Sequence, residues 1–256
     1  MAGQTYREMP PVAALAGHVS MTWVQQVGAT PYVHRSVPSG GVELVCRVGA
    51  PPFVVGPLTG PRIETLAPGS TVVGLRFRPG AAAAVLGVPV PELVEAGAAG
   101  DPSDVLAALQ ELVGRRVDAV DPLVAETVGR LMAGRTAGLG SIWSSLEVSE
   151  RSFRRRCRSA IGMGPKALHR ILRFQGFLAR AQAALARGRR PAEEGLARLA
   201  VDAGYADQAH LTRECVRLTG DTPRRFLGDV ERSCGCGHDH GVSMAVLFNN
   251  GGPSRP

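Results

Sequence analysis

Two cysteines and two histidines fall close together near the end of the chain, in the stretch SCGCGHDHG at residues 233–241. Their sulfur and imidazole groups are the donors that zinc, copper and nickel sites use. They alternate as C-x-C-x-H-x-H, whereas closed zinc sites typically separate two cysteines by two residues. Two interpretations therefore stay open, a metal site completed by an outside ligand or a flexible Gly-rich tail that binds no metal, for Cys234, Cys236, His238 and His240.

A second set of chemistry-bearing residues recurs at a spacing of 58 positions. SERSFRRRCRSAIGMGP (149–165) aligns with DQAHLTRECVRLTGDTP (207–223). Side chains three or four positions apart share one face of a helix, which places polar residues on one face of each copy and apolar residues on the other. The outward-facing side chains are Arg151, Arg154, Arg155 and Arg158 in the first copy, and Gln208, Thr212 and Arg213 in the second.

The chemistry that these side chains predict is DNA binding. Arg can donate two hydrogen bonds to guanine, Gln can bind adenine in the same bidentate way, and both also bind phosphate. A solvated basic face of some helical bundle is the competing interpretation. The repeat of a capped helix after a short turn favours DNA.

Each copy is predicted to be a helix, a tight turn and a second helix that carries the polar face. In the first copy, residues 139–146 form the first helix and Ser149 caps the second. In the second copy, residues 195–204 form the first helix and Asp207 caps the second. The sequence therefore predicts two helix-turn-helix motifs.

LARLAVDAGYADQAHLTRECVRLTGDTPRRFL resembles the second helix-turn-helix of the AraC/XylS family of bacterial transcription regulators, and VSERSFRRRCRSAIGMGPKALHRILRFQ resembles the first. The resemblance covers about residues 122–230. It implies a domain of seven helices, in which a long helix from Pro165 to about Arg187 links two three-helix lobes. It also implies that the two recognition helices enter two successive major grooves, about one helical turn (~34 Å) apart. The base-facing positions that it implies are Arg151, Arg154, Arg155, Gln208, Ala209, Thr212 and Arg213. Ser149, Arg158 and His210 complete the predicted DNA-binding set, with His210 expected to pack or to contact phosphate.

The chain departs from the family pattern at several positions. Cys157 and Cys215 stand where family members usually have Phe, and both face the predicted core. They are expected to act as small buried hydrophobic residues, with redox sensing as the alternative. Glu147 replaces the common turn glycine of the first motif, and the first helix of that motif is more polar than usual.

Net charge divides the chain into two unlike halves. Residues 1–121 carry 8 Lys and Arg against 10 Asp and Glu, whereas residues 122–256 carry 21 against 12. The N-terminal half is thus slightly acidic and the C-terminal half is basic. This asymmetry suggests that the C-terminal half alone binds a polyanionic partner. A GC-rich genome explains the preference for Arg over Lys, but it does not explain this division.

The pattern of apolar residues predicts an α+β protein, with a β-rich N-terminal domain followed by an all-α C-terminal domain with two helix-turn-helix motifs. Alternating runs at residues 41–49 and 70–80 predict strands bounded by Gly or Pro. Apolar spacing of three and four predicts two helices, one capped by Asp101 or Ser103 and one capped by Asp121, with short helical pieces before them. The expected parts are a β-rich effector or dimerisation domain (1–100), a helical connector (101–135), the DNA-binding domain (136–230) and the Cys/His tail (231–256).

The N-terminal half contains the segments PYVHRSVPSGGVELVCRVG (31–49), VVGPLTGPR (54–62) and VVGLRFRPGAAAAVLGVPVPEL (72–93). Together these segments resemble an uncharacterised sensor-like domain of actinobacterial members of the same family. Its notable polar residues are His34, Glu43, Arg76 and Arg78. Together they could bind an anionic or polar effector; the alternative is that each is an exposed strand position.

The predicted function is that of a sequence-specific, cytoplasmic bacterial transcription regulator that associates with the nucleoid. Expected partners are double-stranded DNA, RNA polymerase, a small-molecule effector and a second copy of the chain, with no membrane. No GxGxxG, P-loop, GxSxG or HExxH motif points to an enzyme. The alternatives are a metal-responsive regulator that uses the Cys/His tail, an alkyl-transferring DNA-repair protein that would depend on Cys46, and a non-specific architectural protein.

Overall fold

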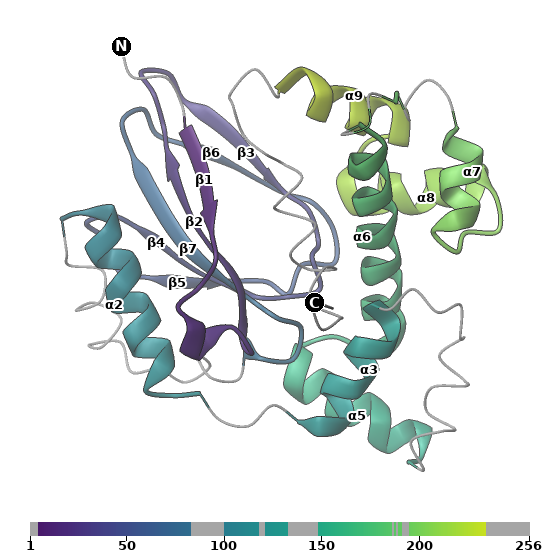
Figure 1. Cartoon of the computed structure of the whole chain (residues 1–256), viewed down its shortest axis with the longest axis horizontal. Coiled ribbons are helices and arrows are strands. Elements are labelled where there is room, and N and C mark those ends of the chain that lie inside the picture. The colour runs from purple at the N-terminus through teal and green to yellow at the C-terminus, as the bar shows by residue number, and fades with distance from the viewer. Residues whose placement is uncertain are drawn as a thin grey trace, which may run out of the picture.

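The computed structural model describes residues 5–82, 100–117, 121–132, 148–185, 187, 189–190 and 195–233. The N-terminal half contains β1 (Thr5–Met9), the 3₁₀ helix η1 (Ala13–Leu15), β2 (Val19–Gln26), β3 (Tyr32–Ser36), β4 (Glu43–Arg47), β5 (Phe53–Val55), β6 (Arg62–Leu66), β7 (Thr71–Phe77) and α2 (Pro102–Gly114). The C-terminal half contains α3 (Pro122–Met132), α5 (Glu150–Ile161), α6 (Pro165–Leu185), α7 (Leu196–Asp202), α8 (Gln208–Thr219) and α9 (Pro223–Ser233). The predicted α+β class, with a β-rich half before a helical half, is confirmed (Figure 1).

The strands form two antiparallel sheets. Five strands pair in the order β1-β2-β7-β4-β5, and β3 pairs with β6. Alternate residues of the large sheet point to opposite sides. Leu44 and Leu75 pack against α2 on one side, while Val45 and Val72 pack against Leu66 of the small sheet on the other. The strands predicted around residues 41–49 and 70–80 are confirmed as β4 and β7, but both of their faces are covered.

The helices expected to form a connector divide between the two cores. Asp101 caps α2, because its carboxylate accepts a hydrogen bond of 2.7 Å from the backbone N–H of Ser103. Val105 and Leu109 of α2 join the core of the large sheet, whereas Val124 of α3 joins the core around α6. α2 is therefore part of the sheet structure, and α3 is part of the helical one.

The long helix α6 organises the C-terminal half, as Figure 1 shows. Buried residues of α3, α5, α7, α8 and α9 pack with Phe174 and Phe177 of α6 in one cluster. Cys157 and Cys215 are completely buried, as predicted. Burial raises the pKa of each thiol to about 11, so both thiols are protonated at neutral pH.

Three predicted features lie outside the residues that the structure describes. They are the first helix of the first motif (139–146), the short helical pieces at 79–87 (from residue 83 on) and 91–97, and the ligand set of the Cys/His tail. Among the described helices, none combines the length and the apolar character needed to span a bilayer.

Candidate nucleic-acid interface

The two predicted recognition helices, α5 and α8, have the same length and the same ends. Ser149 Oγ accepts a hydrogen bond of 3.3 Å from the N–H of Ser152, and Asp207 Oδ1 accepts one of 2.6 Å from the N–H of His210. Each helix has 12 residues and ends at a left-handed glycine, Gly162 (φ 80°) or Gly220 (φ 82°). Glycine adopts this conformation without strain. The repeat of 58 residues is therefore a structural repeat at the recognition helices.

The second motif is described over its whole length. α7 (Leu196–Asp202) lies within the predicted range 195–204 and ends two residues before its predicted end. After the turn, α8 begins at Gln208, directly after the predicted cap Asp207. Tyr205 is buried in this turn, with its ring edge-to-face against the ring of His210 at 5.2 Å. His210 Nδ1 also accepts a hydrogen bond of 3.5 Å from the N–H of Ala206. His210 thus stabilises the turn, which fits the packing role expected for it.

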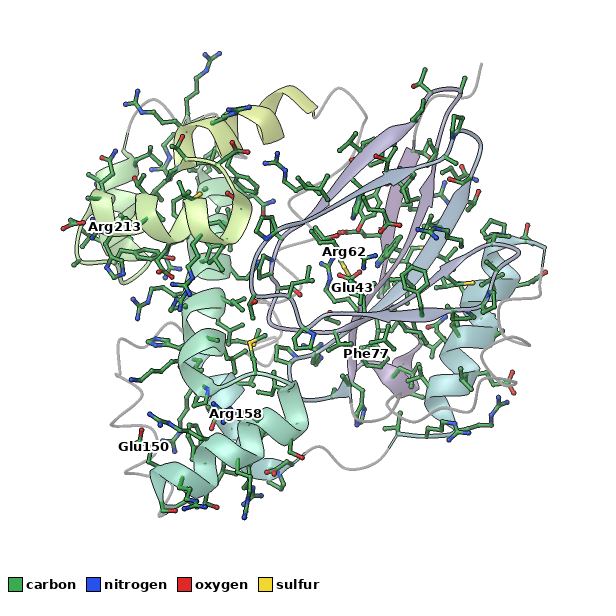
Figure 2. The ribbon with its side chains drawn as sticks, turned by 180° about the vertical axis from the view of Figure 1, so that it is seen from behind. Glu43, Arg62, Phe77, Glu150, Arg158 and Arg213 are labelled. Carbon is green, nitrogen blue, oxygen red and sulfur yellow. The ribbon has the colours of Figure 1, made fainter. Side chains whose placement is uncertain are left out.

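The exposed face of α5 is cationic. Arg151, Arg154, Arg155 and Arg158 are exposed, whereas Phe153 is completely buried. Arg154 forms an ion pair with Glu150 of the same helix. Figure 2 shows Glu150, and Arg213 of α8, on the side of the helical half that faces away from the sheets. Among the described residues, none covers the side of α5 that lies opposite the core.

The exposed face of α8 is chemically mixed. Gln208, Ala209 and Arg213 are exposed, and Thr212 is half-buried. The hydroxyl of Thr212 donates a hydrogen bond of 2.9 Å to the carbonyl oxygen of Gln208, so its hydrogen-bonding capacity is partly used within the helix. What Thr212 can offer to a base is chiefly its methyl group, which suits the methyl group of thymine.

Two ion pairs hold the recognition helices in place. The Arg156 guanidinium donates to both carboxylate oxygens of Asp121, at 2.8 and 2.6 Å, and joins α5 to the start of α3. This hydrogen bonding lowers the pKa of Asp121. Arg170 of α6 binds Glu214 of α8 at 2.8 Å. Sequence reasoning predicted Asp121 only as a helix cap, and the pairing with Arg156 could not be inferred from spacing, because 35 residues separate the two.

A single loop of the N-terminal half contacts the ends of both recognition helices. A β-carbon at Gly162 would lie 2.8 Å from Pro57 Cγ, and one at Gly220 would lie 3.8 Å from Pro61 Cγ. We name residues 56–61 the bridging loop. Carbon atoms pack at about 3.5–4.0 Å, so only glycine fits at Gly162 without displacing Pro57. The bridging loop therefore joins the C-terminal ends of α5 and α8.

Polar contacts accompany the bridging loop. Arg35 of β3 forms an ion pair with Asp221, which follows α8, and this hydrogen bond lowers the pKa of Asp221. Gln175 of α6 is buried, and its amide donates a hydrogen bond of 2.7 Å to the carbonyl oxygen of Pro38. These contacts link the N-terminal half to the helical half at two further points.

The structure brings together three of the four predicted effector residues. His34, Glu43 and Arg76 line one cavity of about 250 Å³ between the two sheets and α6. Arg78 follows the last residue of β7 and does not line this cavity; its Nε donates to the carbonyl oxygen of Ala16 at 2.9 Å. Glu43 and Arg62, both labelled in Figure 2, line a second, smaller cavity between the sheets.

The predicted metal ligands Cys234, Cys236, His238 and His240 lie outside the described residues. Within the described part of the chain, no group of three or more His, Cys, Asp or Glu side chains is arranged to hold a metal ion.

Comparison with known families finds one match in each half of the chain. Residues 143–229 match the family model of a helix-turn-helix domain, and residues 7–98 match a domain of unknown function (DUF6597). No curated protein matches the sequence.

Solved structures of ToxT from Vibrio cholerae are distantly similar to this chain. An apo lysine-to-alanine variant of ToxT from strain SCE256 is 10% identical, with a TM-score of 0.41 over 81% of this chain and 96% of that one. ToxT from V. cholerae O395 is 11% identical, with a TM-score of 0.40 over 88% and 96%. Wild-type ToxT bound to an unsaturated fatty acid is 11% identical, with a TM-score of 0.37 over 88% and 94%. The match to the helix-turn-helix model, rather than this distant likeness, shows that residues 143–229 form a helix-turn-helix domain.

Proposed function

We propose that this chain is a sequence-specific transcription regulator of the AraC type that places α5 and α8 in two successive major grooves, since residues 143–229 match the family model of a helix-turn-helix domain. The observation that carries the proposal is the repeat of a capped, twelve-residue helix with an exposed polar face. Successive major grooves on one face of B-DNA lie one helical turn apart, so a domain with two such helices can bind one side of the duplex.

The two helices are proposed to contact DNA through the residues that the sequence predicts. Arg151, Arg155 and Arg158 extend from the core into solvent and can reach guanine edges or phosphates. The amide of Gln208 can donate to N7 and accept from N6 of adenine, whereas Arg213 can donate twice to guanine. Ser149 and Ala209 stand at the N-terminal ends of these helices, where backbone N–H groups favour phosphate.

Control of DNA binding is proposed to reside in the N-terminal half. An effector that binds among the strands would change the position of the bridging loop, which packs against Gly162 and Gly220. Since those glycines end α5 and α8, a shift of the loop would alter the relative placement of the two helices. The ion pair between Arg35 and Asp221 supports the same coupling.

The domain boundary, the further partners and the location of the protein are proposed as well. We place the boundary between the two halves between α2 and α3, because these helices join different cores. RNA polymerase and a second copy of the chain are proposed partners, and the bacterial cytoplasm is the proposed location.

The direct test is binding of the full-length protein to the DNA upstream of its own gene. We expect this DNA to be retarded in a gel at ~150 mM salt, where non-specific contacts are weakened, while random DNA of equal length is not. Equal retardation of both DNAs would contradict the proposal.

A further inference from the structure

The cavity between the sheets and α6 has aromatic walls. Tyr6, Trp23 and Tyr32 line it, together with the half-buried His34. The rings of Tyr6 and Trp23 lie 6.0 Å apart at 33°, and those of Tyr32 and His34 lie 6.1 Å apart at 56°. Aromatic faces and edges pack well against a planar ring. The volume of about 250 Å³ is slightly below the range of typical small-molecule sites, about 300–1,000 Å³, so a small ring is the size that fits.

One buried donor in this wall has no acceptor. Trp23 is 6% exposed, and its Nε1 has no hydrogen-bond partner among the described residues. The indole lies directly over Gly74, where a β-carbon would be 2.5 Å from the Trp23 ring. Indole nitrogen is a donor only, and a buried donor without an acceptor is unfavourable by about 1–3 kcal/mol. A bound acceptor would remove this cost.

The charged groups around the cavity are already paired. Arg76 Nε donates to Glu43 Oε1 at 2.7 Å, and Glu8 lies near Arg76 as a second carboxylate. The positive charge of Arg35 is directed to Asp221. Burial lowers the pKa of His34, so its imidazole is neutral at neutral pH. An anionic ligand would therefore meet the carboxylate of Glu43, the one carboxylate among the lining residues, without an unpaired cation. A cationic ligand would leave the N–H of Trp23 without an acceptor.

We propose that this cavity binds a small uncharged aromatic molecule that carries a hydrogen-bond acceptor, such as an amide or a ketone, with Trp23 Nε1 as the donor. The proposal rests on the function proposed above, since it names the chemical class of the effector. It also narrows the expectation from the sequence, which was an anionic or polar ligand for His34, Glu43 and Arg76.

The cavity is connected to the recognition helices through its own lining. Leu58 lines it, and Leu58 belongs to the bridging loop, between the two prolines that contact Gly162 and Gly220. Arg35 also lines it and reaches Asp221 after α8. A ligand that contacts Leu58 thus acts on the loop that touches the ends of both α5 and α8.

The binding test uses Trp23 as its own reporter. The chain has two tryptophans, so a full-length Trp143→Phe variant retains only Trp23. Three probes of similar shape differ in charge: benzamide is neutral with an acceptor, benzoate is anionic, and benzylammonium is cationic. We expect benzamide to change the Trp23 emission to saturation, with a dissociation constant at least tenfold below those of the other two. A linear response to benzamide, or benzoate or benzylammonium binding as tightly, would overturn the proposal.

Matched substitutions test the role assigned to the indole N–H. Calorimetry on Trp23→Phe should show about tenfold weaker binding of benzamide, the fold-change expected for the loss of one buried hydrogen bond. Trp143→Phe, the same substitution elsewhere in the chain, should leave the affinity unchanged. Equal affinities of the two variants would overturn the assignment of Trp23 as the donor.

Coupling and DNA binding are measured separately from ligand binding. In the unsubstituted protein, saturating benzamide should change the affinity for the upstream DNA by about fivefold or more. An unchanged affinity would overturn the proposed coupling of the cavity to the recognition helices through Leu58 and Arg35. A protein that binds its DNA specifically but not benzamide would contradict the ligand class alone. A protein that binds benzamide but shows no DNA preference would contradict the proposed function alone.

Discussion

The two recognition helices share their ends and differ in their exposed faces. α5 and α8 each begin at a side-chain cap and end at a left-handed glycine. Yet α5 carries five arginines and one glutamate, whereas α8 carries two arginines and one glutamate, with Gln, Ala and Thr among its outward residues. The residues that begin and end the helix are thus repeated between α5 and α8. The outward-facing residues that would contact DNA differ between the two helices.

This difference suggests a division of labour. A helix face rich in arginine binds DNA mainly through the phosphates, and this binding releases counterions. Its contribution to the affinity therefore depends strongly on the salt concentration. A mixed face of Gln, Arg and a methyl group can distinguish bases. We therefore expect α5 to contribute mainly affinity and α8 mainly discrimination between sequences.

The largest effects should come from the core positions that the two helices share. Phe153 and Leu211 are equivalent residues, and both are completely buried. Phe153→Ala should lower the free energy of unfolding by about 3–5 kcal/mol and Leu211→Ala by about 2–5 kcal/mol, because each leaves a cavity. Denaturant unfolding measures both. A loss below about 1 kcal/mol at either position would mean that its helix is not fixed by the core in this way.

The next largest effects, on DNA binding, should differ between the exposed face of α5 and that of α8. Arg213→Ala should lower the preference for the specific site over random DNA by about 1–3 kcal/mol, since it removes a bidentate donor. Arg158→Ala should weaken binding to both DNAs by a similar factor and lower the magnitude of the salt slope by about 1. Titrations at several salt concentrations provide both quantities. The proposed difference between α5 and α8 would be contradicted if Arg158→Ala changed the preference for the specific site over random DNA while Arg213→Ala left it unchanged.

The caps should have smaller and similar effects. Asp207→Ala and Ser149→Ala each remove a side-chain acceptor from a helix N-terminus, so each should lower the free energy of unfolding by about 0.5–2 kcal/mol. Asp207 makes the shorter bond, 2.6 Å against 3.3 Å, and its substitution should cost more. Asp207→Asn and Ser149→Thr, which keep a capping side chain, should retain most of the stability. Thermal unfolding of the four variants measures this, and alanine variants as stable as the Asn and Thr variants would show that the caps do not matter.

The smallest effect concerns the ion pair within α5. Glu150→Gln removes an exposed partner of Arg154, which should lower the free energy of unfolding by only about 0.3–0.5 kcal/mol. It also removes a negative charge from the face of α5, and DNA binding should therefore tighten. Gel titration at low salt measures the change. Weaker DNA binding by this variant would mean that Arg154 needs Glu150 to be positioned.

Local signals in the sequence were sufficient for the recognition helices. Ser149, Asp207, Gly162 and Gly220 act within a few residues of the helix that they begin or end. The start of α2 could be predicted from Asp101 for the same reason, because this cap residue lies directly before the helix. These elements are decided by backbone hydrogen bonds over short distances, and their boundaries can therefore be inferred from neighbouring residues.

Contacts between distant segments could not be inferred in this way. Pro57 and Gly162 are more than 100 positions apart, and no periodicity connects them. Arg76 and Arg78 stand two residues apart and would share a face if the strand continued, but β7 ends at Phe77 and Arg78 turns away to Ala16. The cavity site thus depends on where a strand ends, which the alternating pattern alone did not determine.

Selection of binding sites from a randomised DNA library by the full-length protein, repeated with Arg155→Ala and Arg213→Ala, tests the central claim most directly. We predict an enriched site with two elements whose centres lie about 10–10.5 base pairs apart, one of which loses its sequence preference in the Arg213→Ala selection. Arg155→Ala should alter the other element and leave this one intact. No enriched sequence, or a site that neither substitution changes, would contradict the account.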